Sequence, residues 1–331
     1  MFWHFFAQLK FLGGVYLGWG GGANDTANIF GPAVATGAIK YRTAVIFASI
    51  FVLLGSVIEG PGLMEEVAGL AGESFNSGMY DSLNLAFVAS LAAGITITIL
   101  TYLAIPASTS QASVGSIMGI GIVLAGFAGA QWAGFLKMFI VWVANPLVTA
   151  VISFILYKAL APLVNYFIRS SILYNRIFGL LMLISGSYGA YTLGASHAAV
   201  TTAPFYKSGV FGDGSSAALW ASFAGGVGMV LGITTYSKKV MKTVGSKIAV
   251  LDPFTAFVSV LGAAITVHMC KIFGVPVSTS QAIVGSVIGV GLVKGARTVN
   301  FKSLRFIFLG WLMTPVVGAV LCYLMIRIFL K

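Results

Sequence analysis

The chain alternates between long apolar runs and short polar segments. Nine runs have helical length and composition: residues 43–58, 84–105, 112–128, 138–157, 177–193, 215–235, 254–273, 282–293 and 306–326. A hydrocarbon core of ~30 Å is crossed by about 20 helical residues, and shorter runs suit broken or re-entrant segments. The runs are continuous, whereas a transmembrane β-barrel would show alternating ten-residue strands. The pattern therefore predicts an all-α integral membrane protein, a polytopic helical bundle.

Composition agrees with this pattern. The chain is 58% hydrophobic and 8% charged, with a mean hydropathy of +0.98, whereas soluble domains carry roughly 25% charged residues. We expect a multi-pass protein of the cell (inner or plasma) membrane, surrounded by lipid bilayer. The net charge of +11 is spread over loops that flank the apolar runs, so it indicates topology rather than nucleic-acid binding. Cys270 and Cys322 lie inside apolar runs, and no disulfide, metal centre or cofactor is expected.

An internal repeat organises the chain. "PASTSQASVG", Pro106 to Gly115, returns as "PVSTSQAIVG", Pro276 to Gly285, 170 residues later. Upstream, "GANDTANIFGPAVATGAI" from Gly22 aligns with "GASHAAVTTAPFYKSGVF" from Gly194, at an offset of 172. The sequence thus predicts two halves and a connection: residues 1–160, a basic cytoplasmic linker at 161–176, and residues 177–331.

Loop charges indicate that the two halves are inverted. Residues 59–81 carry five acids, whereas the corresponding segment 236–250 carries four lysines and no acid. Likewise 294–305 holds four basic residues, and 125–137 holds only Lys137. Because basic loops stay in the cytoplasm, corresponding loops lie on opposite sides of the bilayer. Inverted repeats with broken helices are typical of secondary transporters, whose substrate site lies at the midplane between the repeats.

The repeated "STSQ" segment is suited to bind an anion. A proline ends the preceding helix, and Ser and Thr are good N-caps, so a new helix is predicted to start here. Its free N–H groups and hydroxyls form an anion site without a formal charge. The alternative is that these hydroxyls only bond back to the preceding turn. The glycines at 115, 119 and 121 and their repeat partners indicate close helix packing. The predicted anion-binding residues are Ser108, Thr109, Ser110, Gln111, Ser278, Thr279, Ser280 and Gln281.

The second motif, "GGANDTANIFGP", is suited to a cation. Asp25 lies in an otherwise uncharged stretch, and a carboxylate within a membrane indicates function. Asn24, Asp25 and Asn28 offer hard oxygen ligands for Na⁺, or Asp25 alone could carry H⁺. The alternative is a structural Asp that caps a helix.

These residues together resemble the inorganic phosphate transporter (PiT) family. The resemblance rests on "GANDTAN", the paired "PxSTSQAxVG" and "VMKTVGSKI" at 240–248, and it extends over nearly the whole chain. The family contains cation-coupled phosphate permeases and a bacterial sulfate permease branch. The resemblance implies an inverted-repeat transporter, a homodimer, with the anion held by the two STS segments. It also implies that Asn24, Asp25 and Asn28 serve the cation, and that Asn24 contacts the anion.

One departure from the family pattern bears on the substrate. Phosphate members repeat Gly-Ala-Asn-Asp in both halves, but the second copy here has Ser196 and His197, with Val200 opposite Asn28. Phosphate keeps a proton that needs an acceptor, whereas sulfate needs donors only. We therefore expect sulfate rather than phosphate, with Ser196 and His197 facing the anion. Alternatively, His197 is a neutral residue bonded within the bundle, or a titrating coupling site.

The sequence thus predicts a secondary active transporter of a tetrahedral oxyanion, coupled to Na⁺ or H⁺ and working by alternating access. A Na⁺-coupled phosphate symporter is the alternative, and an anion channel of the same fold is a further one. An enzyme with a nucleophilic Ser108 or Ser278 is not expected. A nucleophilic serine needs a positioned base, and His268, ten residues before Ser278, has no counterpart in the first half. A scaffold is not expected either, because the chain has no sizeable soluble domain.

Overall fold

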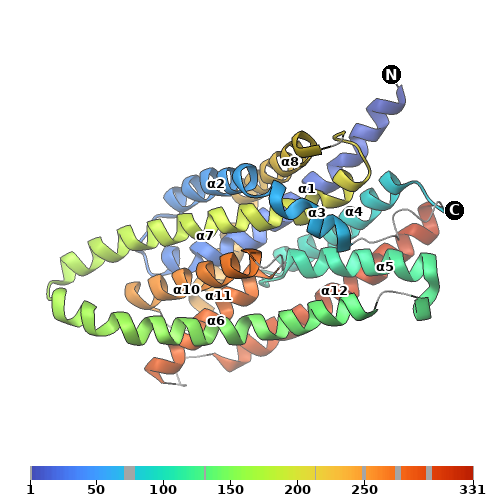
Figure 1. The fold of residues 1–331 in the computed structure, drawn as a ribbon. Coiled ribbons are helices and arrows are strands. Elements are labelled where there is room, and N and C mark those ends of the chain that lie inside the picture. The colour runs from blue at the N-terminus through green and yellow to red at the C-terminus, as the bar shows by residue number, and fades with distance from the viewer. Residues whose placement is uncertain are drawn as a thin grey trace.

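The computed structural model describes residues 2–70, 79–129, 132–212, 214–247, 251–272, 277–295 and 300–330. These residues form helices and no strand, as predicted. The helices are α1 (Phe2–Ala35), α2 (Tyr41–Ile58), α3 (Pro61–Leu70), α4 (Ser82–Tyr102), α5 (Thr109–Gly129), α6 (Trp132–Phe167), α7 (Ser171–Lys207), α8 (Gly214–Tyr236), α9 (Lys238–Lys247), α10 (Pro253–Ile272), α11 (Thr279–Lys294) and α12 (Phe301–Phe329). Figure 1 shows most of them running along one common axis.

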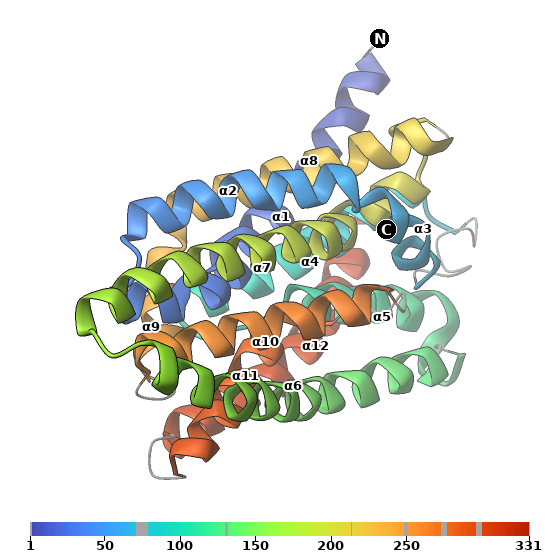
Figure 2. The same ribbon diagram turned by 60° about the vertical axis from the view of Figure 1, so that its left-hand side comes forward.

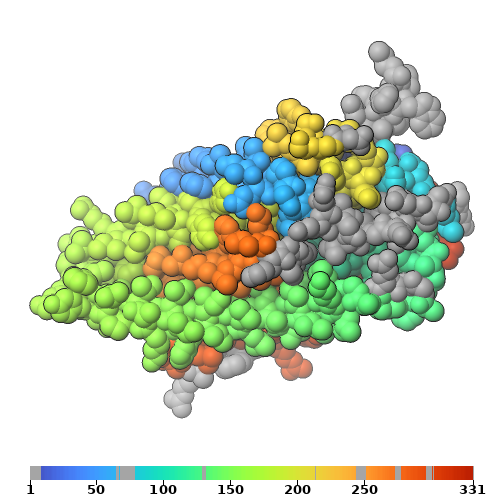
Figure 3. All heavy atoms as spheres, viewed as in Figure 1, coloured from blue at the N-terminus to red at the C-terminus, as the bar shows by residue number. Residues whose placement is uncertain are grey.

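Eight of the described helices are long and apolar enough to cross a membrane. Helix α11 is shorter, with 16 residues, as a broken segment should be. Apolar side chains on α6 point outward, among them Leu147, Val151 and Ile155, each more than half exposed. Figure 3 shows α6, in green, along one side of the molecule. An exposed apolar face is what a lipid-facing helix requires. The protein is a multi-pass membrane protein.

The two halves are interlocked, and the main helix contacts occur in repeat-related pairs. Helix α1 packs against α8 and α9, and its counterpart α7 packs against α2 and α3. In the same way α1 packs against α4 while α7 packs against α10, and α5 packs against α12 while α11 packs against α6. The pattern relates α1–α6 to α7–α12 by an approximate two-fold operation. The fold is thus the predicted bundle of two inverted repeats with broken helices.

The predicted linker, residues 161–176, is almost entirely helical. Helix α6 continues to Phe167 and α7 begins at Ser171, so only residues 168–170 separate the two helices. The division of the chain at 160 and 176 stays a prediction.

The charged loops lie at opposite ends of the bundle. Helix α3 follows Glu59 and precedes Asp81, and the corresponding helix α9 carries Lys238 and Lys239. Figure 2 shows α3 and α9 at opposite ends. The side chains of Glu65, Glu66, Glu73, Lys247 and Arg297, which also entered the charge comparison, lie outside the described residues. The described charges fit the inverted arrangement.

New helices begin at the two STS segments, as the capping argument predicts. Helix α11 starts at Thr279 after the N-cap Ser278, whose Oγ accepts a hydrogen bond from the Gln281 N–H at 3.2 Å. Ser108 does the same for Gln111 at the start of α5, also at 3.2 Å. Pro276, which precedes the second segment, lies outside the described residues. The sequence identity of the two segments is thus matched by the same local geometry.

Four of the six repeat-related glycines sit where helices touch. A Cβ on Gly115 would lie 2.2 Å from the Pro315 carbonyl oxygen, and one on Gly285 would lie 2.2 Å from that of Pro146. The pair four residues further on is equally tight, at Ala319 and Ala150. The prediction is wrong for Gly121, where no atom lies within 4 Å of the added Cβ. These contacts fix α5 on α12 and α11 on α6, and thereby place both STS segments.

Candidate anion and cation site

The predicted site residues are buried in the middle of the bundle. Helix α1 supplies Asn24, Asp25 and Asn28, and α7 supplies Ser196 and His197. The starts of α5 and α11 supply the remaining predicted residues, all buried: Ser108, Thr109, Ser110, Gln111, Ser278, Thr279, Ser280 and Gln281. Four helices, two from each half, therefore meet here.

Asp25 and His197, which correspond in the repeat, face each other. Asp25 Oδ2 accepts a 2.5 Å hydrogen bond from the Thr109 hydroxyl and lies 3.7 Å from His197 Nε2. The same Nε2 lies 3.4 Å from Thr279 Oγ1, and Nδ1 lies 2.9 Å from Ser196 Oγ. The one described carboxylate of the site therefore stands at the junction of the halves, next to the starts of α5 and α11.

The serines of each STS segment are paired with each other. The hydroxyl oxygens of Ser108 and Ser110 are 3.0 Å apart, and those of Ser278 and Ser280 are 2.9 Å apart. Each pair lies in the first turn of a helix, where unbonded N–H groups and the helix dipole favour an anion. Because a hydroxyl can rotate, each serine can donate to an anion while its partner accepts.

Asn24 braces the segment between α4 and α5. Its side-chain amide donates to Thr101 Oγ1 at 2.9 Å and to the Ile105 carbonyl at 3.1 Å, and its Oδ1 accepts from the Ala107 N–H at 2.9 Å. Two of these bonds satisfy backbone groups in the break between α4 and α5, and the third ties Asn24 to the end of α4. The Asn24 side chain is thus bonded within the protein. Its contacts with cation and anion stay a prediction.

Two oxygens on one face of α1 form a candidate cation site. Asp25 Oδ1 and Asn28 Oδ1 are buried and have no hydrogen-bond partner among the described residues. Asp25 and Asn28 are three residues apart and share a face of the helix. Hard, unpaired oxygens of this kind suit Na⁺. Thr26 Oγ1 is also buried without a described partner, but Thr26 lies on a different face of α1 from Asn28.

Two further features were not predicted. Asn145 on α6 donates to the Ser278 carbonyl at 2.9 Å, so it positions the N-cap of α11. Trp142 and Trp311 have buried indole N–H groups without a partner in the described part of the chain. Their 169-residue spacing matched them in the repeat, which was the available signal.

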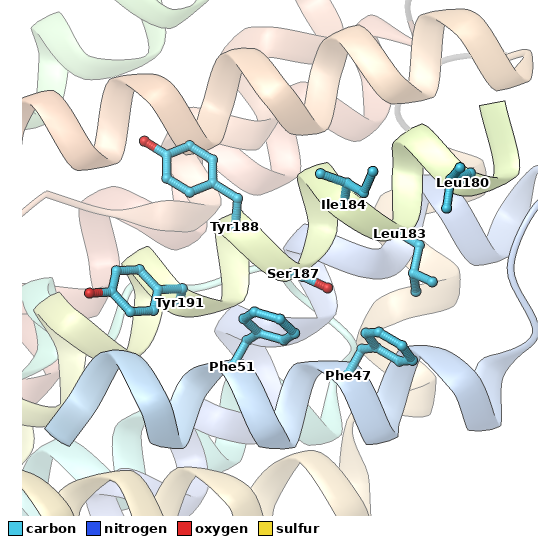
Figure 4. A pocket seen from close by; sticks show the side chains of 8 residues that line it. All are labelled: Phe47, Phe51, Leu180, Leu183, Ile184, Ser187, Tyr188 and Tyr191. Atoms are coloured by element: carbon cyan, nitrogen blue, oxygen red, sulfur yellow. The ribbon is translucent and has the colours of Figure 1, made fainter. Parts of the chain in front are cut away.

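A separate hollow lies between α2 and α7, away from these residues. It measures about 470 Å³ and has Phe47 and Phe51 on one side and Tyr188 and Tyr191 on the other. Figure 4 shows both phenylalanines pointing from α2 toward α7. None of the predicted site residues lines this hollow, and apart from Ser187 its walls are aromatic and aliphatic, so it is not a candidate for the anion.

Comparisons with known proteins agree on one family. The family model described as "Phosphate transporter family" matches residues 21–322. Among relatives named as phosphate permeases, that of Chlamydia trachomatis is 27% identical over 94% of this chain and 95% of its own length. That of Methanocaldococcus jannaschii is 29% identical over 92% of both chains. The solved structure titled "The sodium-dependent phosphate transporter" matches with a TM-score of 0.82 and 24% identity, over 96% of this chain and 97% of that one.

These findings bear on the substrate expectation and on the family. The preference for sulfate finds no support in them, and the alternative, phosphate, fits them better. The resemblance seen in the sequence is confirmed, because the family model matches most of the chain. The protein belongs to the phosphate transporter family.

Proposed function

We propose that the protein carries inorganic phosphate across the membrane together with Na⁺, as a secondary active transporter that works by alternating access. Membership of a transporter family makes it a carrier rather than an enzyme. The proposal concerns which anion and which cation the buried site holds.

The observation that carries the proposal is the carboxylate of Asp25 at the starts of α5 and α11. Phosphate near neutral pH keeps at least one proton, and a buried P–OH needs an acceptor. Asp25 Oδ1 is a buried acceptor without a partner among the described residues. Sulfate, which has no proton to donate, would leave such an acceptor unpaired. The free carboxylate oxygen therefore favours phosphate.

The same geometry weakens the argument for sulfate. It assumed that replacing Asp by His197 leaves the second half without an acceptor. Asp25 Oδ2 and His197 Nε2 are 3.7 Å apart, so one carboxylate from the first half serves both halves. His197 and Ser196 then supply donors to a site whose acceptor comes from α1.

Na⁺ is the proposed coupling ion, with H⁺ as the alternative. The unpaired oxygens of Asp25 and Asn28 support a Na⁺ site on α1, and the structural neighbour is named as sodium-dependent. A cation there would offset part of the charge of the anion in a region of low dielectric. The protein loaded with both ions would then change between its inward-open and outward-open forms at a lower electrostatic cost than the protein loaded with the anion alone. A homodimer stays a prediction.

Uptake into proteoliposomes tests the proposal. Radiolabelled phosphate and sulfate would be offered separately, each with an inward Na⁺ gradient, with choline in its place, and with a pH gradient alone. We expect concentrative phosphate uptake with Na⁺, little with choline, and weak competition by excess sulfate.

Three results would contradict this expectation. Sulfate uptake that phosphate barely inhibits would restore the sulfate hypothesis and give His197 the deciding role. Phosphate uptake driven equally well by a pH gradient without Na⁺ would replace Na⁺ with H⁺. Downhill flux without accumulation under any gradient would instead indicate a channel.

A further inference from the structure

Asn145 on α6 places a buried amide against the start of α11. The side chain is 3% exposed, and its Nδ2 donates to the Ser278 carbonyl at 2.9 Å. The amide can point only one way, because a carbonyl accepts and does not donate, and because Thr149 Oγ1 lies 3.4 Å from Oδ1. The bond joins α6 of the first half to the N-cap of α11 in the second half.

The Ser278 carbonyl belongs to the peptide group with which α11 starts. It accepts the first intrahelical bond, from the Ala282 N–H at 3.0 Å, and Asn145 is its second donor. The other end of the same peptide group is the Thr279 N–H. This N–H is among the first of the helix, which have no partner within the helix itself, so it is available to an anion.

A donor to the carbonyl of a peptide group also affects the N–H of that group. The group is planar and conjugated, so holding the carbonyl in place also holds the direction of the N–H. Hydrogen bonds that follow one another polarise one another, so the N–H becomes a stronger donor when the carbonyl accepts. Asn145 can therefore act on an anion at the Thr279 N–H without touching the anion.

The first half lacks this contact among the described residues. The residue that follows Asn145 by 169 positions is Thr314, whose Oγ1 donates to the Gly310 carbonyl of its own helix at 2.6 Å. The packing of α12 on α5 nevertheless repeats that of α6 on α11. The start of α5 is instead held by Asn24 of α1, which accepts from the Ala107 N–H. One asparagine thus holds each STS segment, but from a different kind of helix and at a different peptide group.

We propose that Asn145 is a positioning residue for phosphate, which directs the N–H at the start of α11 toward the anion and strengthens it as a donor. The free N–H groups and the positive end of the helix dipole bind an anion without a formal charge, and Asn145 acts on this part of the site. The inference rests on the proposed function. It adds that the backbone of the second STS segment contributes more to phosphate binding than that of the first.

Asn145→Leu tests this role, because Leu is similar in size and has no donor. Thr314→Val is the matched control at the corresponding position, where the hydroxyl bonds back to its own helix. Purified proteins in detergent with NaCl would be compared by equilibrium binding of radiolabelled phosphate. Uptake into proteoliposomes would give the KM for phosphate and, at saturating phosphate, the Na⁺ concentration for half-maximal uptake. Thermal unfolding without phosphate is the folding control.

We expect Asn145→Leu to bind phosphate roughly five-fold more weakly, as for the loss of one hydrogen bond. The KM for phosphate should rise by a similar factor. The half-maximal Na⁺ concentration should stay that of the wild type, because the proposed cation site is on α1 and not on α6. Thr314→Val should match the wild type in all three measurements.

If Asn145→Leu does not fold, Asn145→Thr introduces the residue type that the first half carries at this position, and its KM should rise in the same way. Wild-type phosphate affinity in a folded Asn145 variant would overturn the positioning role alone. An equal loss of affinity in Thr314→Val would also overturn it, since the loss would then come from helix packing on either side. A wild type that binds no phosphate would overturn the proposed function as well.

Discussion

Asp25 concentrates the chemistry of the site in one side chain. Its Oδ2 is bonded to Thr109 and faces His197, while its Oδ1 has no partner among the described residues. The first oxygen therefore fixes the orientation of the carboxylate, and the second is free to meet a cation or a phosphate proton.

Asp25→Asn separates these two tasks. Asn has nearly the same shape and can still accept from Thr109, but it lacks the charge that attracts Na⁺. We expect folded protein whose phosphate uptake is reduced at least ten-fold and no longer rises with Na⁺. Uptake against Na⁺ concentration, with thermal unfolding as the folding control, checks this. A Na⁺ dependence like that of the wild type would remove Asp25 from the cation site.

Thr109 and Thr279 occupy corresponding positions in the two STS segments but have different partners. Thr109 donates to a carboxylate at 2.5 Å, whereas Thr279 makes a 3.4 Å contact with an imidazole nitrogen. Hydrogen bonds to charged groups contribute about 1.5–3 kcal/mol, against about 0.5–1.5 for neutral pairs. We expect Thr109→Val to lower phosphate affinity more than Thr279→Val in binding titrations. Equal losses would mean that both hydroxyls act on the anion alone.

At the scale of the helix, the position of each STS segment depends on tight glycine contacts. Gly285 approaches the Pro146 carbonyl so closely that an added Cβ would be 2.2 Å from it. Helices α6 and α11 would have to separate, and overpacking of this kind costs about 1–3 kcal/mol.

Gly285→Ala should therefore lower the unfolding temperature in detergent and reduce phosphate uptake. Gly121→Ala is the control, because nothing lies within 4 Å of the Cβ that it adds. Similar melting temperatures for the two variants would mean that the α6–α11 contact relaxes freely.

Three helices are joined by polar contacts of Glu59, just beyond the end of α2. Lys271 on α10 lies 2.6 Å from its Oε2, and Tyr191 on α7 donates to its Oε1 at 2.8 Å. Partial burial raises the pKa of Glu59, but the hydrogen bonds and charge of its partners outweigh burial and hold the pKa below its ordinary value. The ionised carboxylate therefore favours the folded state.

A lowered pKa fixes the sign of the pH effect. The stabilisation from Glu59 is complete above its unfolded pKa and is lost as pH falls from about 5 through the folded pKa. Glu59→Gln should lower the melting temperature near neutral pH and make the decline on acidification shallower. A variant whose melting temperature follows the wild type at every pH would show that these contacts contribute nothing to stability.

Helices could be predicted from the sequence where neighbouring residues alone determine them. Helix starts at Thr109 and Thr279 follow from capping residues, and the apolar runs follow from composition. The role of Asn24 could not be predicted, because its partners at Thr101, Ile105 and Ala107 are brought near only by the fold. The meeting of Asp25 with His197 depends on how the two halves interlock, which no local pattern specifies.

For the whole molecule, the charges at its two ends predict an orientation in the membrane. We expect the end that carries α9, with Lys238 and Lys239, to face the cytoplasm, and the end with Glu59 and Asp81 to face outward. Figure 2 shows α3 and α9 separated by the full length of the bundle.

Single cysteines test this orientation in a Cys270→Ser background, since Cys322 is fully buried. Both Asp81 and Lys239 are exposed. Asp81→Cys should react with an impermeant maleimide in intact cells, and Lys239→Cys only after permeabilisation. The reverse pattern would invert the topology and exchange the inner and outer ends of the anion route.

The unequal halves have a consequence for the direction of transport. In an inverted-repeat carrier, exchanging the conformations of the two halves turns the inward-open form into the outward-open one. Identical halves would give both forms the same free energy, so a carrier at rest would divide its time evenly between them. Asp25 opposite His197, and an α11 of 16 residues opposite an α5 of 21, remove that equality. We therefore expect the resting protein to favour one of the two forms, and the affinity for the transported anion to differ between the two faces of the membrane.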